Sequence, residues 1–122
     1  MLSGLCVLVV EDDPLIAMVI CDNVESVGGT VAGPFSTVGE ALTFLTQAKI
    51  DAAIVDANLR DGDVTPLALF LMETAIPFIV YSAAGLPPEL HARHPDLPLV
   101  MKPGKPLERL FALLRNGTTD AL

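Results

Sequence analysis

The segment Leu5-Cys-Val-Leu-Val-Val-Glu-Asp-Asp-Pro14 passes directly from an apolar run into three acidic residues and a proline. An unbroken apolar run of this length is typical of a strand that is buried on both faces, as in a parallel sheet. Pro14 favours the first turn of a helix, because its missing N–H would have no partner there. Apolar residues then recur at spacings of three and four until Gly28-Gly29, which predicts the end of that helix. The segment therefore indicates a buried strand, an acidic turn and a helix.

The same alternation continues along the rest of the chain. Four further short apolar runs lie at residues 30–32, 52–55, 77–81 and 98–101. Segments with helical spacing separate them, and these begin at Thr37-Val-Gly-Glu40, Thr65-Pro66 and Pro106. We expect residues 58–63 to form a loop, residues 86–94 to form at most a short helix, and the last helix to end at Asn116-Gly117. Five strands that alternate with helices indicate an α/β fold with a parallel sheet.

Length and composition exclude several classes of protein. The chain has 122 residues, 52% of them apolar, which suits one domain with a buried core. Its formal net charge is −8, so we expect it to bind neither nucleic acid nor an anionic membrane surface. No apolar run approaches the ~20 residues of a membrane span, and the N-terminus lacks the basic start of a secretory signal. Cys6 and Cys21 form no metal motif or disulfide framework, which favours reduced thiols in a cytoplasmic protein.

Charged and hydroxyl side chains follow four of the five predicted strands. Asp12-Asp13 comes after the first strand, Asp56 after the third, Ser82 after the fourth and Lys102 after the fifth. In parallel α/β sheets the ligand site lies beyond the carboxyl ends of the strands, near the point where the strand order reverses. The sequence therefore predicts that these side chains meet at one edge of the sheet.

This set of residues suits a divalent cation and phosphoryl chemistry. Carboxylates that lie close together keep their charges only beside a positive group, and Mg²⁺ (or Mn²⁺) takes oxygen ligands. We expect Asp13 and Asp56 to bind the metal directly, Asp12 to bind it directly or through water, and the backbone carbonyl of Asn58 to complete the set. A carboxylate can also attack phosphorus to give an aspartyl-phosphate. Lys102 would neutralise the developing charge, and the Ser82 hydroxyl would hydrogen-bond a phosphoryl oxygen.

Four dispersed motifs carry a resemblance over essentially the whole chain. Val9-Val-Glu-Asp-Asp-Pro-Leu-Ile16, Asp56, Tyr81-Ser-Ala83 and Lys102-Pro103 resemble the receiver domain of two-component response regulators. The resemblance implies a flavodoxin-like, doubly wound (βα)5 fold with strand order 2-1-3-4-5. It implies that Asp56 accepts a phosphoryl group from the phosphohistidine of a histidine kinase or histidine phosphotransferase. It assigns Mg²⁺ binding to Asp12 and Asp13, the switch hydroxyl to Ser82, pairing with the phosphoryl group to Lys102, and a cis bond to Lys102–Pro103.

A narrower likeness concerns the third and fourth strand regions. Asp56-Ala-Asn-Leu-Arg-Asp-Gly62 and Ile76-Pro-Phe-Ile-Val-Tyr-Ser82 resemble alphaproteobacterial single-domain receivers, whose fourth strand follows a Pro-Phe pair and reads roughly Phe-Ala-Thr-Gly. One position departs from the wider family. Receivers carry a Tyr or Phe three residues before the lysine, where this chain has Leu99. Either Tyr81 substitutes for that ring, or the signal travels through the loop and short helix after Ser82.

Three other interpretations remain open. Asp12 or Asp13 could merely cap the helix that begins at Pro14, since Asp is a favoured cap. The chain could be a phosphohydrolase of the haloacid dehalogenase type, although such enzymes place an Asp-x-Asp motif after the first strand. It could also be a receiver-like interaction module that is never phosphorylated, and Leu99 favours this alternative.

Our prediction is a stand-alone receiver spanning residues 1–122, with no output domain. We expect it to catalyse only its own phosphorylation and dephosphorylation, and to be a monomer or weak dimer. Its output would be the binding of an unknown downstream protein, or service as a phosphate shuttle or sink.

Overall fold

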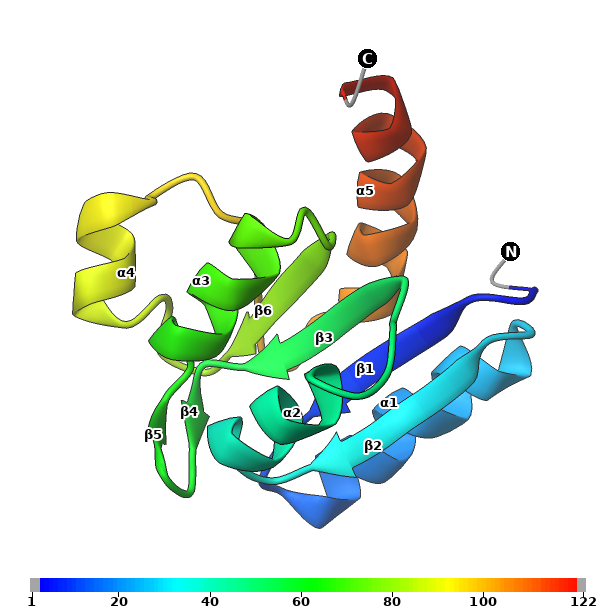
Figure 1. Ribbon diagram of the computed structural model, residues 1–122, viewed down its shortest axis with the longest axis horizontal. Coiled ribbons are helices and arrows are strands. Elements are labelled where there is room, and N and C mark those ends of the chain that lie inside the picture. Colours follow the sequence, from blue (N-terminus) through cyan, green and yellow to red (C-terminus); the bar gives the residue numbers. More distant parts are fainter. Residues whose placement is uncertain (1–2, 121–122) are drawn as a thin grey trace.

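A five-stranded parallel sheet forms the centre of the molecule (Figure 1). The computed structural model describes residues 3–120, with side chains described up to residue 116. The main-sheet strands are β1 (Cys6–Val10), β2 (Thr30–Phe35), β3 (Ala52–Asp56), β6 (Phe78–Ser82) and β7 (Leu99–Met101). The helices are α1 (Pro14–Ser26), α2 (Val38–Leu45), α3 (Thr65–Glu73), α4 (Pro88–Arg93) and α5 (Pro106–Asp120). A small hairpin consists of β4 (Asn58–Leu59) and β5 (Gly62–Asp63).

The strand order confirms the predicted flavodoxin-like fold. The main sheet runs β2-β1-β3-β6-β7, which is 2-1-3-4-5 when its strands are counted along the chain. All four pairings are parallel. The chain leaves β1 for β2 on one side and returns for β3 on the other, so the order reverses between β1 and β3. The carboxyl ends of these two strands therefore flank the position where such sheets bind ligands.

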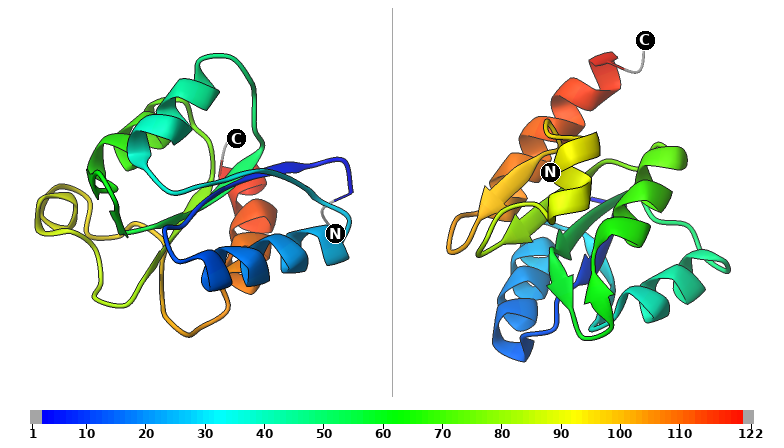
Figure 2. Two further views of the ribbon diagram at one scale, coloured as in Figure 1. Left: turned by 90° about the horizontal axis from the view of Figure 1, so that it is seen from below. Right: turned by 90° about the vertical axis from the view of Figure 1, so that its left-hand side faces the viewer.

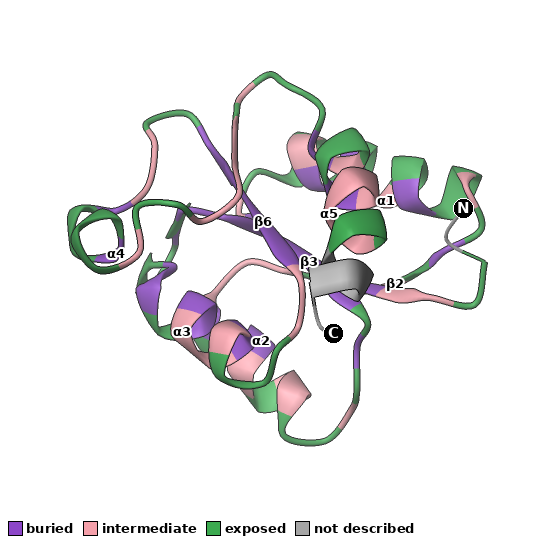
Figure 3. Cartoon of the chain, turned by 90° about the horizontal axis from the view of Figure 1, so that it is seen from above, coloured by how far each residue is buried: buried purple, intermediate pink, exposed green. Residues whose placement is uncertain are grey.

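The alternation of side chains along each strand divides the core into two layers. In β1, Val7 and Val9 pack with α1 and α5, whereas Leu8 and Val10 pack with the helices of the other face. Figure 2 shows α1 and α5 on one side of the sheet and α2 and α3 on the other. The central strands lie buried between these layers in Figure 3. Burial on both faces explains why the strands are unbroken apolar runs.

Local signals begin the first two helices and end the first of them, and the glycine stop and the capping box are as predicted. Asp13 caps α1, and its Oδ1 accepts hydrogen bonds from the N–H groups of Leu15 at 2.9 Å and Ile16 at 3.4 Å. At the other end Gly28 has a φ of +93°, a left-handed conformation that glycine adopts without strain. The Thr37 Oγ1 accepts from the Glu40 N–H at 3.0 Å, which confirms the capping box at α2.

Three expectations about local structure were wrong. Residues 58–63 are an antiparallel hairpin and not an irregular loop. Its Asp61 accepts the Val38 N–H at 2.8 Å and the Gly39 N–H at 2.9 Å, a long-range contact that no local pattern reveals. The last helix runs on to Asp120 instead of ending at Asn116-Gly117, since one glycine costs a helix only about 1 kcal/mol. The second strand is longer than residues 30–32 and reaches Phe35.

The extended second strand passes through Gly33 and Pro34 at the edge of the sheet. An edge strand tolerates proline because its outer side makes no ladder hydrogen bonds. A Cβ atom at Gly33 would lie 2.7 Å from the Val9 carbonyl oxygen, so this position accepts only glycine. Among residues 3–120, no helix is long and apolar enough to cross a membrane.

Candidate functional site

Three carboxylates meet at the carboxyl edge of the sheet. Glu11 directly follows β1, Asp12 is the next residue, and Asp56 is the last residue of β3. One oxygen from each of the three lies within 4.8 Å of the others. Glu11 is 3% exposed and Asp56 is 6% exposed, so two of the three carboxylates are withdrawn from water. Their position follows from the topology, because β1 and β3 are parallel neighbours that end side by side.

Lys102 supplies the positive charge of this cluster. Its Nζ lies 3.3 Å from Asp56 Oδ2 and 3.1 Å from Glu11 Oε1. The residue follows β7, and its side chain extends past β6 to reach β3 and β1. Burial by itself lowers the pKa of Lys102, but the contacts with Glu11 and Asp56 outweigh it and raise the pKa overall. The ammonium therefore keeps its charge at neutral pH.

Glu11 has an unusual protonation equilibrium. Burial, together with a hydrogen bond to Asp56, raises the pKa of Glu11 from 4.5 to about 7. Its Oε2 accepts the Asp13 N–H at 3.1 Å. Its buried Oε1 lies beside Lys102 but accepts no hydrogen bond from the residues that the structure describes. One lysine thus does not satisfy the cluster, and a hard cation that takes oxygen ligands fits this donor set.

The structure brings Asp12, Asp56 and Lys102 together as predicted, but it does not bring Asp13 with them. The Asp13 side chain is exposed and is occupied as the cap of α1. Glu11 takes the place that the sequence reasoning gave to Asp13. A signal for this was present: the apolar run ends at Val10, so Glu11 is the first residue past the strand, and the residue before Pro14 is the natural cap.

Ser82 ends β6 beside the cluster and is 1% exposed. Its hydroxyl donates to the Gly85 carbonyl at 2.8 Å and accepts from the Ala84 N–H at 3.0 Å, so it closes the following turn. Its own carbonyl accepts the Lys102 N–H at 2.8 Å. Ser82 and Lys102 are therefore linked through the backbone. Asn58 lies two residues after Asp56, at the start of the hairpin.

Leu99 and Tyr81 lie on opposite faces of the sheet. Leu99 pairs with Val80 and packs with the core beneath α2, α3 and α4, whereas Tyr81 pairs with Val100 and packs with the core beneath α1 and α5. Adjacent positions of a strand point to opposite faces. The Tyr81 ring therefore faces α1 and α5, and not the helices that position 99 contacts.

Comparisons with known proteins place this geometry in a family. No family model matches the chain, and no curated protein matches it. Among solved structures, SdrG from Sphingomonas melonis Fr1 is 35% identical, with a TM-score of 0.72 over 90% of this chain and 97% of SdrG. The REC domain of the response regulator PhyR from Erythrobacter litoralis is 28% identical, with a TM-score of 0.75 over 93% of this chain and 89% of that domain. The chain belongs to the response-regulator receiver domains.

Two further matches add detail to this membership. The BeF3-activated conformation of SdrG is 36% identical to this receiver, with a TM-score of 0.71 over 93% of this chain and 98% of that one. The anti-anti-sigma factor PhyR from Bartonella quintana is 30% identical, with a TM-score of 0.72 over the whole of this receiver. This chain spans 53% of that PhyR. SdrG and PhyR confirm the narrower likeness to alphaproteobacterial receivers, and the Lys102–Pro103 bond is cis as that family implies.

Proposed function

We propose that this receiver accepts a phosphoryl group on Asp56 from the phosphohistidine of a histidine kinase or histidine phosphotransferase. The supporting observation is that Asp56 alone among the three acids both ends a central strand and lies beside Lys102, within reach of Glu11 and Asp12. This is the arrangement that phosphoryl transfer needs, since such catalysis is mostly positioning and neutralisation of charge.

The transfer exchanges one bond to phosphorus for another. A carboxylate oxygen of Asp56 forms a bond to phosphorus while the phosphorus–nitrogen bond of the donor histidine breaks, and the bonding electron pair stays on the imidazole nitrogen. The product is an acyl phosphate. Lys102 stands 3.3 Å from Asp56 Oδ2, where its ammonium offsets the negative charge that gathers on the phosphoryl oxygens.

Glu11, Asp12 and Asp56 would hold a divalent cation, Mg²⁺ or Mn²⁺, with the Asn58 backbone carbonyl as a further ligand. When bound, such an ion offsets the repulsion between the carboxylates and the incoming phosphoryl group. Asp13 is left out of this ligand set because α1 engages its carboxylate. Ser82 would give up its hydrogen bond to Gly85 and donate to a phosphoryl oxygen, which would release the turn after β6.

The output of this change would be the binding of a downstream protein, or the passing on of the phosphoryl group. Phosphorylation would shift a pre-existing equilibrium between two conformations. A shift from 1:99 to 99:1 requires about 5.5 kcal/mol of differential stabilisation. We expect the chain to catalyse only its own phosphorylation and dephosphorylation.

Intact-mass spectrometry tests the proposal directly. The protein is incubated with Mg²⁺ and acetyl phosphate, with Asp56→Asn and Asp13→Asn as matched variants. We expect a phosphoryl adduct on the wild type and on Asp13→Asn, and none on Asp56→Asn. No adduct on the wild type, together with no bound beryllofluoride in fluorine-19 NMR, would overturn the proposal. Rapid multiple turnover of phosphate esters would favour the hydrolase instead.

A further inference from the structure

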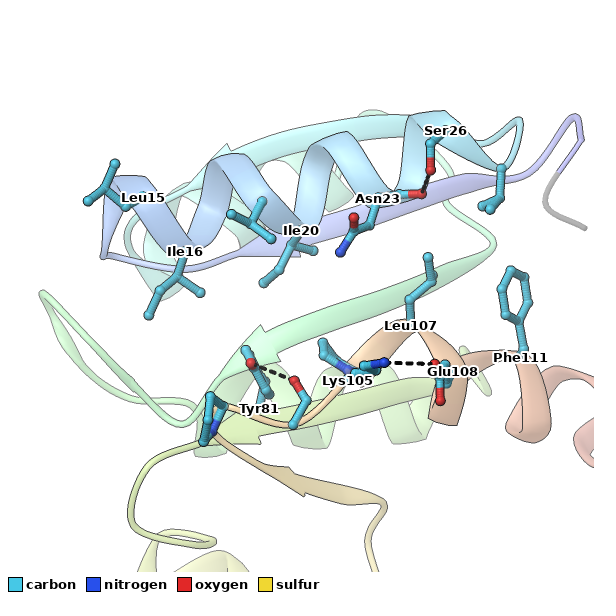
Figure 4. Close-up of a pocket in the computed structure, with 15 residues that line it drawn as sticks. Leu15, Ile16, Ile20, Asn23, Ser26, Tyr81, Lys105, Leu107, Glu108 and Phe111 are labelled. Atoms are coloured by element: carbon cyan, nitrogen blue, oxygen red, sulfur yellow. Dashed lines mark hydrogen bonds and ion pairs between the residues drawn. The ribbon is translucent and has the colours of Figure 1, made fainter.

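A groove runs between α1 and α5 on the face of the sheet opposite Leu99 (Figure 4). It has a volume of about 730 Å³. Its walls are largely apolar, with Ile16 and Ile20 from α1 and Leu107 and Phe111 from α5. Tyr81 also lines it, at the end of the groove nearest the turn that follows β7. Tyr81 thus lines the groove and also belongs to β6, the strand that ends at Ser82.

Tyr81 contacts the Lys102 turn in two ways. Its hydroxyl donates a hydrogen bond to the Gly104 carbonyl at 2.8 Å. The Lys102 ammonium lies 5.5 Å from the centre of its ring, within the range of a cation–π interaction. The same ammonium lies 3.3 Å from Asp56 Oδ2. A continuous chain of contacts therefore joins Asp56 to Lys102, Lys102 to Tyr81, and Tyr81 to the groove.

The Lys102 turn is tightly built, so that its two contacts with Tyr81 are not independent. The Gly104 N–H donates to the Met101 carbonyl at 2.8 Å, which closes the turn around Lys102. A Cβ atom at Gly104 would lie 2.8 Å from that carbonyl oxygen and 2.9 Å from a Val100 methyl carbon. A backbone shift at Lys102 would therefore also move the Gly104 carbonyl that Tyr81 holds.

We propose that Tyr81 couples the phosphoacceptor site to the groove between α1 and α5. The inference rests on the proposed function, because it takes phosphorylation of Asp56 as the event that is transmitted. A phosphoryl group adds negative charge beyond the Asp56 carboxylate and draws the Lys102 ammonium toward it. The ammonium then changes its distance from the Tyr81 ring, and the turn carrying Gly104 moves with it. Tyr81 adjusts, and the groove walls that pack beside it change shape.

This route differs from a switch that uses a ring three residues before the lysine. Leu99 has no ring, and it faces the helices on the other side of the sheet. Tyr81 directs the response toward α1 and α5 instead. The coupling therefore predicts which face of the molecule responds to Asp56, and this can be measured.

Intrinsic fluorescence provides the first test, because Tyr81 is the only tyrosine of a chain that has no tryptophan. Mg²⁺ and beryllofluoride are titrated into the wild-type protein, with Asp13→Asn and Asp56→Asn as matched variants. We expect a change in tyrosine emission that saturates together with the bound fluorine-19 signal in the wild type and in Asp13→Asn. Asp56→Asn should show neither. Bound beryllofluoride with unchanged emission would overturn the coupling alone. No bound beryllofluoride would overturn the proposed function, and the coupling would fall with it.

Methyl NMR provides the second test, with a variant that keeps the ring. Tyr81→Phe removes the hydrogen bond to Gly104, and Leu99→Val is the control on the opposite face. In the wild type we expect beryllofluoride to shift the methyl signals of Ile20 and Leu107. In Tyr81→Phe these shifts should be smaller by about twofold or more at saturation, whereas Leu99→Val should leave them unchanged. Groove shifts of wild-type size in Tyr81→Phe, or loss of them in Leu99→Val, would overturn the proposal.

Discussion

The two faces of the central sheet are covered to different extents. Three helices, α2, α3 and α4, close one face, and one inward residue from each, Ala41, Leu71 and Leu90, is fully buried. On the other face α1 and α5 leave the groove between them (Figure 4). Helix α1 exposes Leu15 at 70% and Val19 at 54%. We call these the closed face and the open face. The difference shows that the closed face carries more of the core, whereas part of the apolar surface of the open face contributes little to folding.

A cavity on the closed face should have the largest effect on stability. Leu71 of α3 is 0% exposed, so Leu71→Ala should lower the free energy of unfolding by about 2–5 kcal/mol, measured by urea denaturation. Leu107→Ala on the open face removes the same atoms from a partly buried site that borders the groove, and it should cost less. Equal losses for the two variants would contradict the comparison between the faces.

The free energy of unfolding should depend on pH through Glu11, which lies at the carboxyl edge of the sheet, between the two faces. Its pKa is about 7 in the folded protein and near its ordinary value of 4.5 in the unfolded chain. Between these values the folded state binds more protons, so the free energy of unfolding falls as pH rises. The stabilisation is complete below about pH 4.5 and is lost as pH passes 7, with a total of at most about 3 kcal/mol.

Urea denaturation of the metal-free protein between pH 5 and pH 8 measures this effect. Glu11→Gln removes the titrating group, so its stability should vary less with pH over the same range. Added Mg²⁺ should raise wild-type stability more at pH 8 than at pH 6, because the ion and the proton compete for the same carboxylates. The hypothesis fails if the wild type and Glu11→Gln show the same dependence on pH.

Substitutions of Asp13 and of its neighbour Asp12 should distinguish helix capping from metal binding. Asp13→Ala removes the cap of α1 on the open face and should cost about 1 kcal/mol in urea denaturation. Its affinity for Mg²⁺ in calorimetric titration should stay close to that of the wild type. Asp12→Ala should weaken Mg²⁺ binding much more than Asp13→Ala does. The opposite ranking would return Asp13 to the ligand set.

The smallest expected effect is on the exposed side of α1. Val19 is 54% exposed, so Val19→Ser should change the free energy of unfolding by no more than about 0.5 kcal/mol. Val24 on the same helix is 0% exposed, and Val24→Ser should be several times more destabilising in the same urea experiment. If Val19→Ser were as damaging as Val24→Ser, the outer side of α1 would be part of the core after all.

Much of the fold was predictable from local patterns. The apolar run before Glu11, the capping box at Thr37 and the glycine pair after Val27 each act within a few residues, and the structure confirms all three. The hairpin at residues 58–63 was not predictable in this way. It is held by Asp61, whose carboxylate contacts backbone groups of α2 that lie more than twenty residues earlier in the chain.

The sequence by itself determined the fold class, the resemblance to receivers, and the convergence of Asp12, Asp56 and Lys102 at one edge. It could do so because parallel strands that alternate with helices all end at the same edge, whatever their exact packing. Only the tertiary structure showed that the Glu11 carboxylate is buried beside Lys102, and that Tyr81 and Leu99 face opposite ways. The first point depends on neighbouring elements that cover the Glu11 side chain, and the second on strand pairing, because successive side chains along a strand point to opposite faces of the sheet.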